Sequence, residues 1–327
     1  MNRRDFLKLL QAGVLLFSPV KATLAASPKQ GTGFVYDDLF LEHCLEKGHP
    51  ESPDRLHSIM KTMEQSGLLQ YLSRIQPKKD ILQELALIHT AEHVQALELN
   101  HKQSNEVALA VVGAILAATD EVCRGRLKNA FCATRPPGHH ARNTGRVEGF
   151  CFYNGVAIAA RYAQKSYSLK KILIVDWDYH HGNGTEAFFY SDPSILYFST
   201  HDYYAYPGTG NPANIGEGAG KGLNINVHLD CHSTDKDIIS AFKEKLLPAT
   251  HRFKPDLILI SAGFDSRQDD LLGCFDISDA GYRQITTMVM QLAEQYCDGR
   301  VVSVLEGGYN LDGLASAVKV HVETLQG

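Results

Sequence analysis

The sequence predicts an α/β protein in a single domain, built on a doubly wound, mostly parallel sheet with helices on both faces. Three observations predict this class. Short, continuous apolar runs rich in β-branched residues recur along the chain, as in strands that are buried on both faces. Longer stretches of helical character alternate with these runs. With 327 residues and 44% hydrophobic content, and without an internal repeat or linker, the chain has enough apolar material for one large core.

The first segment resembles an export signal and is expected to be separate from the fold. Arg3, Arg4 and Lys8 precede an apolar run at 9–17, and small residues follow at 22–26. The paired arginines followed by Phe-Leu-Lys resemble the bacterial twin-arginine signal. We therefore expect a signal peptide at 1–25, a functional domain at 26–327, and a periplasmic protein without stable membrane anchoring. The alternatives are a basic amphipathic helix and a cytoplasmic location.

The strands and helices are predicted in order along the rest of the chain. The first apolar run, 130–134, follows a predicted helix at 107–122, and a helix at 156–164 leads to the run at 172–175. Two further runs, 195–198 and 223–227, precede a helix at 235–247. The last runs, 257–260 and 301–305, flank a helix at 279–296. Each run is short enough for a strand, and each helical stretch is long enough to cross back over a sheet.

Charge and cysteine content narrow the function classes. A formal net charge of -5 gives no basic surface for nucleic acid phosphates, so we expect no nucleic acid partner. The seven cysteines show no C-x-x-C spacing, and we interpret them as small core residues or free thiols instead of a disulfide framework or a thiolate zinc site. Some of them could pair in an oxidising compartment, but the sequence does not indicate which.

Polar and glycine residues gather directly after the predicted strands. In a doubly wound sheet, ligands bind beyond the carboxyl ends of the strands, so these residues are the candidates for chemistry. They lie at five strand ends, namely His139 and His140; Asp176, Asp178, His180 and Asn183; Ser199, Thr200 and His201; Asp265; and Glu306, Gly307, Gly308 and Tyr309.

A metal site is the first interpretation of this set. Asp178 and His180 are two residues apart on an extended segment, so their side chains point the same way, and Asp265 is the natural third ligand. Three protein ligands leave a position open, as in catalytic zinc sites. Oxygen and nitrogen ligands also suit Fe(II), Co(II) or Mn(II). The alternative for an isolated Asp-x-His pair is a surface turn.

The remaining residues suggest the reaction. His139 and His140 follow two prolines and a glycine that restrict the backbone, and a neutral histidine beside a metal-bound water can act as general base and then general acid. Tyr309 follows two glycines and can donate to an oxygen that gains negative charge. We expect Glu306 to anchor the Tyr309 loop. The alternatives are a solvated histidine loop and a core tyrosine. Together these parts predict metal-assisted hydrolysis of an acyl group.

The motifs also resemble those of a known family. The sequence runs RPPGHHA at 135–141, GFCFYN at 149–154, DWDYHHGNGT at 176–185, SAGFD at 261–265 and LEGGYN at 305–310. In this order they resemble the zinc-dependent histone deacetylases, most closely the class II and bacterial deacetylase-like branch. The resemblance extends from residue 32 to the C-terminus and implies the arginase/deacetylase fold.

The resemblance also implies roles for individual residues. It implies one zinc held by Asp178, His180 and Asp265, with His140 as general base and acid and Tyr309 polarising the carbonyl. His139 is implied as the electrostatic partner, with Asp176 behind it, and Asn183 behind His140. A structural potassium near Asp176, Asp178, His180, Ser199 and Thr200 is implied as well.

Substrate preference follows from the tunnel residues that the resemblance implies. Gly149, Phe150 and Tyr206 resemble the walls of a narrow tunnel for the acetylated side chain. Leu272 stands where polyamine-preferring relatives carry Glu, and Tyr309 stands where less active class II relatives carry His. Tyr309 favours a competent deacetylase, and Leu272 favours an acetyl-lysine peptide over an acetylpolyamine as substrate. The alternatives are a small acetylated amine such as an acetylpolyamine, a non-catalytic acyl-lysine binding protein and, less favoured, an arginase-like ureohydrolase. The oligomeric state stays open.

Overall fold

The computed structural model describes residues 31–327, and the predicted signal peptide lies outside these residues. The described chain forms one eight-stranded sheet in the order β2-β1-β3-β8-β7-β4-β5-β6. Every strand pair is parallel. The strands are β1 (Thr32–Val35), β2 (Leu72–Ile75), β3 (Asn129–Cys132), β4 (Ile172–Asp176), β5 (Ile195–His201), β6 (Asn224–His228), β7 (Leu257–Ala262) and β8 (Val301–Leu305). The predicted α/β class and the six predicted strands are confirmed.

Two strands, β1 and β2, were not predicted. Each has four residues; β1 includes Gly33, and β2 has Ser73 and Arg74 exposed at its centre. Neither is a continuous apolar run, which is the pattern that predicted the other six. β2 lies at the edge of the sheet, where a strand needs fewer apolar residues.

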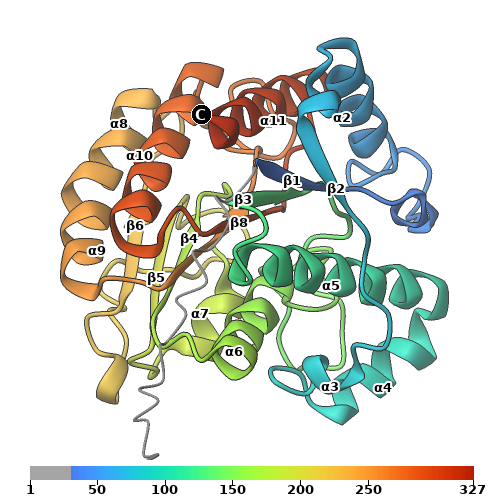
Figure 1. The fold of residues 1–327 in the computed structure, drawn as a ribbon, viewed down its shortest axis with the longest axis horizontal. Coiled ribbons are helices and arrows are strands. Elements are labelled where there is room, and N and C mark those ends of the chain that lie inside the picture. Colours follow the sequence, from blue (N-terminus) through green and yellow to red (C-terminus); the bar gives the residue numbers. More distant parts are fainter. Residues whose placement is uncertain (1–30) are drawn as a thin grey trace, which may run out of the picture.

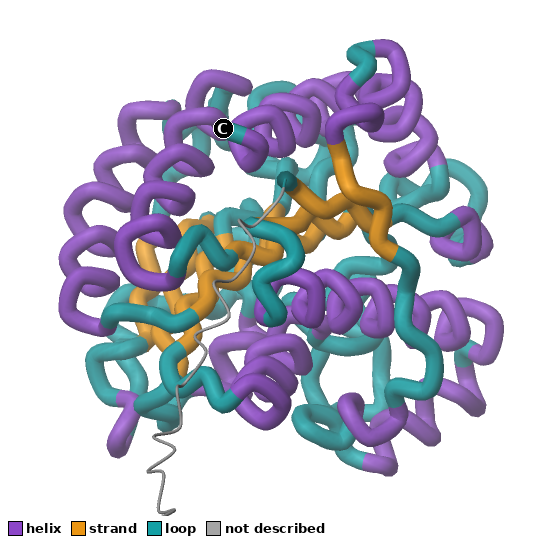
Figure 2. The backbone as a smooth tube through the Cα atoms, in the orientation of Figure 1, coloured by secondary structure: helices purple, strands orange, loops and turns teal. Residues whose placement is uncertain are grey.

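Helices cover both faces of the sheet, as Figures 1 and 2 show. One layer contains α2 (Asp54–Gln65), α8 (Asp235–Ala241), α9 (Leu247–Phe253), α10 (Asp279–Cys297) and α11 (Leu311–Gln326). The other contains α3 (Leu82–Leu85), α4 (Ala91–Asn100), α5 (Lys102–Cys123), α6 (Gly155–Tyr167) and α7 (Asn183–Phe189). The predicted helix at 235–247 is observed as α8 and α9 joined by a π-helical turn at Phe242–Leu246. Among the helices of residues 31–327, none is long and apolar enough to cross a bilayer.

The sheet brings the predicted site residues to one edge. Because all eight strands run in the same direction, their carboxyl ends lie together. Strands β3, β8, β7, β4 and β5 are consecutive neighbours in the middle of the sheet, and these are the strands after which the candidate residues lie. In register, Asp176 at the end of β4 is paired with Ser199 of β5 on one side and Ser261 of β7 on the other.

The cysteines differ from the prediction at one pair. Cys231 and Cys274 form a disulfide, with Cα atoms 5.2 Å apart, across 43 residues of sequence. The connection after β6 and the segment after β7 lie side by side here, as the backbone bond from His232 N–H to the Cys274 carbonyl shows (2.7 Å). Only the tertiary structure joins these segments, so cysteine spacing could not reveal the bond. Cys132 and Cys151 are buried, as expected of small core residues.

Candidate active site

Asp178, His180 and Asp265 come together beyond the ends of β4 and β7. Their potential ligand atoms all lie within 4.8 Å of one another. His180 Nδ1 is 3.1 Å from Asp178 Oδ1 and 3.0 Å from Asp265 Oδ2. Both aspartates are buried, and His180 is nearly so. Among residues 31–327, these three residues are the one group of Asp, Glu, His or Cys side chains found with a geometry that could hold a metal ion.

The electrostatics of this group fit a divalent cation. Two carboxylates are buried side by side, and burial together with the charge of Asp178 raises the pKa of Asp265 to about 7. A cation between them would stabilise both carboxylates in their ionised form. One imidazole and two carboxylates, without thiolate, suit zinc in an open catalytic site and also Fe(II) or Co(II).

Gly307 lets the segment after β8 approach this group closely. Its N–H donates to Asp178 Oδ2 at 2.8 Å. A Cβ atom at Gly307 would lie 2.1 Å from Asp265 Oδ2 and 2.7 Å from Asp178 Oδ2, which is far inside contact distance. Glycine is therefore required here by the two carboxylates, and it fixes the path of the chain toward Tyr309.

His139 and His140 lie beside this group with different partners. His139 Nδ1 is 3.0 Å from Asp176 Oδ2, and His140 Nδ1 is 2.9 Å from Asn183 Oδ1. Burial opposes a charge on His139, but the carboxylates of Asp176 and Asp178 outweigh it and raise its pKa well above the usual range. Burial, and then the charge of His139, lower the pKa of His140 well below the usual range. The two imidazoles therefore differ in charge at neutral pH, and His140 is the one able to accept a proton.

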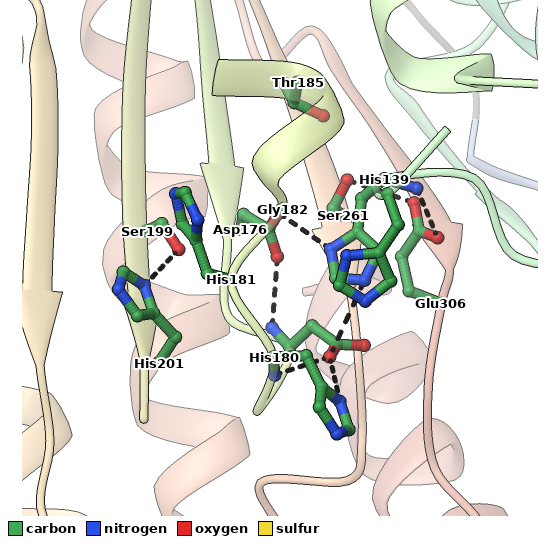
Figure 3. A network of polar contacts seen from close by, with 12 residues as sticks. His139, Asp176, His180, His181, Gly182, Thr185, Ser199, His201, Ser261 and Glu306 are labelled. Atoms are coloured by element: carbon green, nitrogen blue, oxygen red, sulfur yellow. Dashed lines mark hydrogen bonds and ion pairs between the residues drawn. The ribbon is translucent and has the colours of Figure 1, made fainter. Parts of the chain in front are cut away.

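Glu306 anchors the histidine loop. Its Oε2 accepts the N–H of Gly138 at 2.6 Å and that of His139 at 3.2 Å, and its Oε1 accepts the hydroxyl of Ser261 at 3.1 Å. Figure 3 shows Glu306 next to His139, with Asp176 on the other side of the imidazole. The expectation that Glu306 anchors the Tyr309 loop is thus corrected. The Glu306 carboxylate binds the loop after β3, which contains Gly138 and His139, because β3 and β8 are neighbours in the sheet.

Tyr309 is buried, and the Arg55 side chain contacts its ring and the backbone just before it. The Arg55 guanidinium lies 4.9 Å from the centroid of the Tyr309 ring. Arg55 Nε donates to the Gly308 carbonyl at 2.7 Å, and Nη2 donates to the Glu306 carbonyl at 2.5 Å. Burial raises the pKa of Tyr309 well above its usual range although Arg55 opposes this, so the hydroxyl keeps its proton and can donate it in a hydrogen bond.

A cavity of about 610 Å³ connects these residues to the surface. It is lined by Pro137, His139, His140, Val147, Gly149, Phe150, Asp178, Tyr179, His180, Ala205, Tyr206, Leu272, Gly307 and Tyr309. A Cβ atom at Gly149 would lie 2.2 Å from the His140 ring and 2.9 Å from that of Tyr206, so glycine keeps this wall narrow. Tyr206 is 50% exposed and Leu272 39% exposed, and both lie at the mouth. The three residues predicted as tunnel walls, Gly149, Phe150 and Tyr206, thus line the cavity, and so does Leu272.

Of the residues implied for a potassium ion, Asp178 and His180 belong to the metal group, and Asp176, Ser199 and Thr200 lie in the neighbouring strands β4 and β5. Ser199 Oγ bonds His201 Nδ1 at 2.8 Å, as Figure 3 shows. Asp178 N–H donates to Asp176 Oδ1 at 3.2 Å. The buried hydroxyl of Thr200 has no hydrogen-bond partner within residues 31–327. A cation here stays a proposal.

Four residues with clear structural roles, Glu51, Arg55, Arg135 and Asp270, were not singled out as site residues. Glu51 and Arg55 form a buried ion cluster with Arg135, in which Glu51 binds Arg135 through Nε and Nη2 at 2.8 Å each. Asp270 caps the backbone at Tyr309. Glu51 lies just before α2, four residues from Arg55, and this spacing was the available signal. The link from Arg55 to the Tyr309 segment crosses more than 250 residues of sequence.

Fold and site together define a class of protein: a parallel α/β domain with a buried Asp, His and Asp group able to hold a metal ion at the carboxyl edge of its sheet, next to a histidine pair and a tyrosine. Comparison with protein-family models matches residues 49–325 to the histone deacetylase domain. The chain belongs to the histone deacetylase family, and the predicted family and arginase/deacetylase fold are confirmed.

Individual relatives agree with this assignment. Histone deacetylase 15 of Arabidopsis thaliana is 36% identical over 93% of this chain and 58% of its own length. Histone deacetylase 9 of Homo sapiens is 36% identical over 92% of this chain and 34% of its own length. The chain therefore spans between about one third and three fifths of these relatives. The crystal structure of the HDA15 HD domain has a TM-score of 0.85 and 36% identity, covering 91% of this chain and 88% of that one.

Proposed function

We propose that this protein is a metal-dependent deacetylase that hydrolyses the amide of N-acetylated amines, with acetyl-lysine side chains of peptides as the preferred substrate. The observation that carries the proposal is that Asp178 and His180, which are grouped with Asp265, line one cavity together with His140 and Tyr309 in a histone deacetylase domain. We propose zinc as the ion, with Fe(II) or Co(II) as alternatives.

The reaction follows from what each side chain can do. A bound divalent cation supplies Lewis acidity to the acetyl carbonyl and lowers the pKa of water. His140 accepts the proton of the attacking water and returns it to the leaving amine, since its depressed pKa leaves it neutral. Tyr309 donates a hydrogen bond to the carbonyl oxygen as negative charge develops there. His139 and Asp176 form an ion pair beside His140, and this pair keeps the charges next to His140 in fixed positions.

Release of acetate from an acetyl-lysine peptide tests this proposal. We expect zinc-loaded protein to release acetate with saturation kinetics, and chelator-treated protein to lose this activity and recover it on zinc addition. Acetylspermidine in parallel distinguishes a small-amine amidohydrolase. Saturable peptide binding without acetate release from zinc-loaded protein would contradict catalysis and identify an acyl-lysine binding protein.

The preference for a peptide over an acetylpolyamine depends on Leu272 at the cavity mouth. A second ammonium group of a polyamine finds no carboxylate at this position. Leu272→Glu is expected to raise kcat/KM for acetylspermidine relative to an acetyl-lysine peptide by about fivefold, the effect of one partly exposed ion pair.

Leu271→Glu is the matched control for this substitution. Leu271 is 66% exposed and does not line the cavity. A glutamate at this position therefore adds the same charge next to the mouth but outside the cavity. We expect no change in substrate preference in this variant. An equal shift in both variants would refute a specific role for Leu272.

Export by the twin-arginine route is a further proposal. The Cys231–Cys274 disulfide supports it, because disulfides persist in oxidising compartments such as the periplasm. A fusion of residues 1–30 to a reporter is expected to reach the periplasm, and replacing Arg3 and Arg4 by Lys is expected to abolish this. Unchanged export of the double-lysine fusion would rule out the twin-arginine route.

A further inference from the structure

Asp270, in the segment after β7, uses both oxygens of its carboxylate to bind the backbone around the site. Oδ2 accepts the N–H of Tyr309 at 2.7 Å and that of Asn310 at 3.1 Å. Oδ1 accepts the N–H of Leu272 at 2.9 Å. One side chain thus connects the residue at the mouth of the cavity to the tyrosine at its base.

The segment that carries Asp270 is itself held at both ends. Asp265, at its start, accepts the N–H of Tyr179 at 2.9 Å. Cys274, at its end, is bonded to Cys231 and lies 3.3 Å from the Tyr179 hydroxyl. Asn310 Nδ2 donates back to the Asp269 carbonyl at 2.8 Å, so the Tyr309 segment and the Asp270 segment bind each other in both directions. The backbone that carries Asp270 is therefore fixed in position on both sides.

We propose that Asp270 is a positioning residue that sets the place of the Tyr309 hydroxyl for carbonyl polarisation and couples it to the Leu272 rim. This inference rests on the proposed deacetylase function. Arg55 holds the carbonyl side of the same turn, at Gly308, and Asp270 holds its N–H side. With both sides fixed, the Tyr309 ring keeps one orientation in the cavity before substrate binds.

Asn at position 270 keeps the size of the side chain but not its hydrogen bonds. An amide has one accepting oxygen, and its NH2 group would face an N–H on the other side. Whichever way the amide turns, either the Leu272 bond or the Tyr309 and Asn310 bonds are lost, and the bonds that remain lose the negative charge of their acceptor. We expect Asp270→Asn to lower kcat for an acetyl-lysine peptide by about tenfold or more, since the charge-assisted bonds to the tyrosine segment are removed or weakened in either orientation.

Asp269→Asn is the matched control. Asp269 is exposed, its carboxylate makes no hydrogen bond or ion pair within the described residues, and its φ of 64° is one that Asn adopts readily. This variant is expected to keep the kcat of the unmodified protein. Inactivity of the unmodified protein would overturn the proposed function, whereas normal kcat in Asp270→Asn would overturn only the role of Asp270.

A double substitution separates positioning from general destabilisation. If Asp270 acts through Tyr309, Asp270→Asn adds less than about threefold to the loss caused by Tyr309→Phe. Losses that multiply in full would overturn the proposal. Hydrogen exchange gives a readout without activity or metal: exchange of the Tyr309 and Asn310 amides is expected to rise in Asp270→Asn but not in Asp269→Asn, and unchanged exchange would contradict the proposal.

Discussion

Asp265→Asn is expected to reduce hydrolysis of an acetyl-lysine peptide by about a thousandfold or more, the largest effect we predict. The substitution replaces one of two buried anionic ligands with a neutral amide of nearly the same shape. The negative charge that binds a divalent cation is thereby halved, while Asp178 and His180 keep their places. Initial rates with zinc in excess measure the loss, and metal titration measures the weaker binding.

Asp276→Asn provides the control for this prediction. Asp276 is also an aspartate after β7, but it is half-exposed and pairs with the exposed His232. We expect its activity and zinc binding to match those of the unmodified protein. An Asp265→Asn variant that retained more than about a tenth of the activity would show that this carboxylate does not hold the catalytic ion.

Tyr309→Phe is expected to lower kcat by about 100-fold to 1,000-fold, with a much smaller change in KM. The substitution removes one hydroxyl oxygen and leaves the ring against Arg55 and Phe150. The lost hydrogen bond strengthens only as charge develops on the carbonyl oxygen, so the transition state is affected more than the bound substrate. Steady-state kinetics on one acetyl-lysine peptide separate the two parameters.

Tyr204→Phe is the comparison for this result. Tyr204 is 81% exposed and does not line the cavity. Its loss of a hydroxyl is expected to leave kcat unchanged. If Tyr309→Phe instead raised KM and left kcat intact, Tyr309 would contribute to binding and not to carbonyl polarisation.

Sequence patterns predicted the centre of the sheet and the residues at its carboxyl edge. Five of the six predicted strands are buried on both faces and are mostly apolar, and the candidate ligand residues follow such strands directly. The sixth, the edge strand β6, is only partly buried. Asp178 and His180 were predictable because their spacing is local. Asp265 was predictable because parallel topology brings the ends of neighbouring strands together.

What the sequence did not reveal depends on contacts between distant segments. Arg55 reaches Tyr309 from α2, and Asp270 binds the same tyrosine from the segment after β7. Both are charged residues with polar neighbours in the sequence, so the sequence alone does not distinguish them from surface residues. The Cys231–Cys274 bond belongs to the same category, since it joins segments after β6 and β7, which are not adjacent in the sheet.

The proposed reaction requires one divalent cation held by Asp178, His180 and Asp265. Anomalous diffraction at the zinc edge, from crystals of the protein grown with zinc, locates this ion. We expect one strong peak within coordination distance of a carboxylate oxygen of each aspartate and a ring nitrogen of His180. A peak elsewhere, or no peak among these three side chains at saturating zinc, would contradict it.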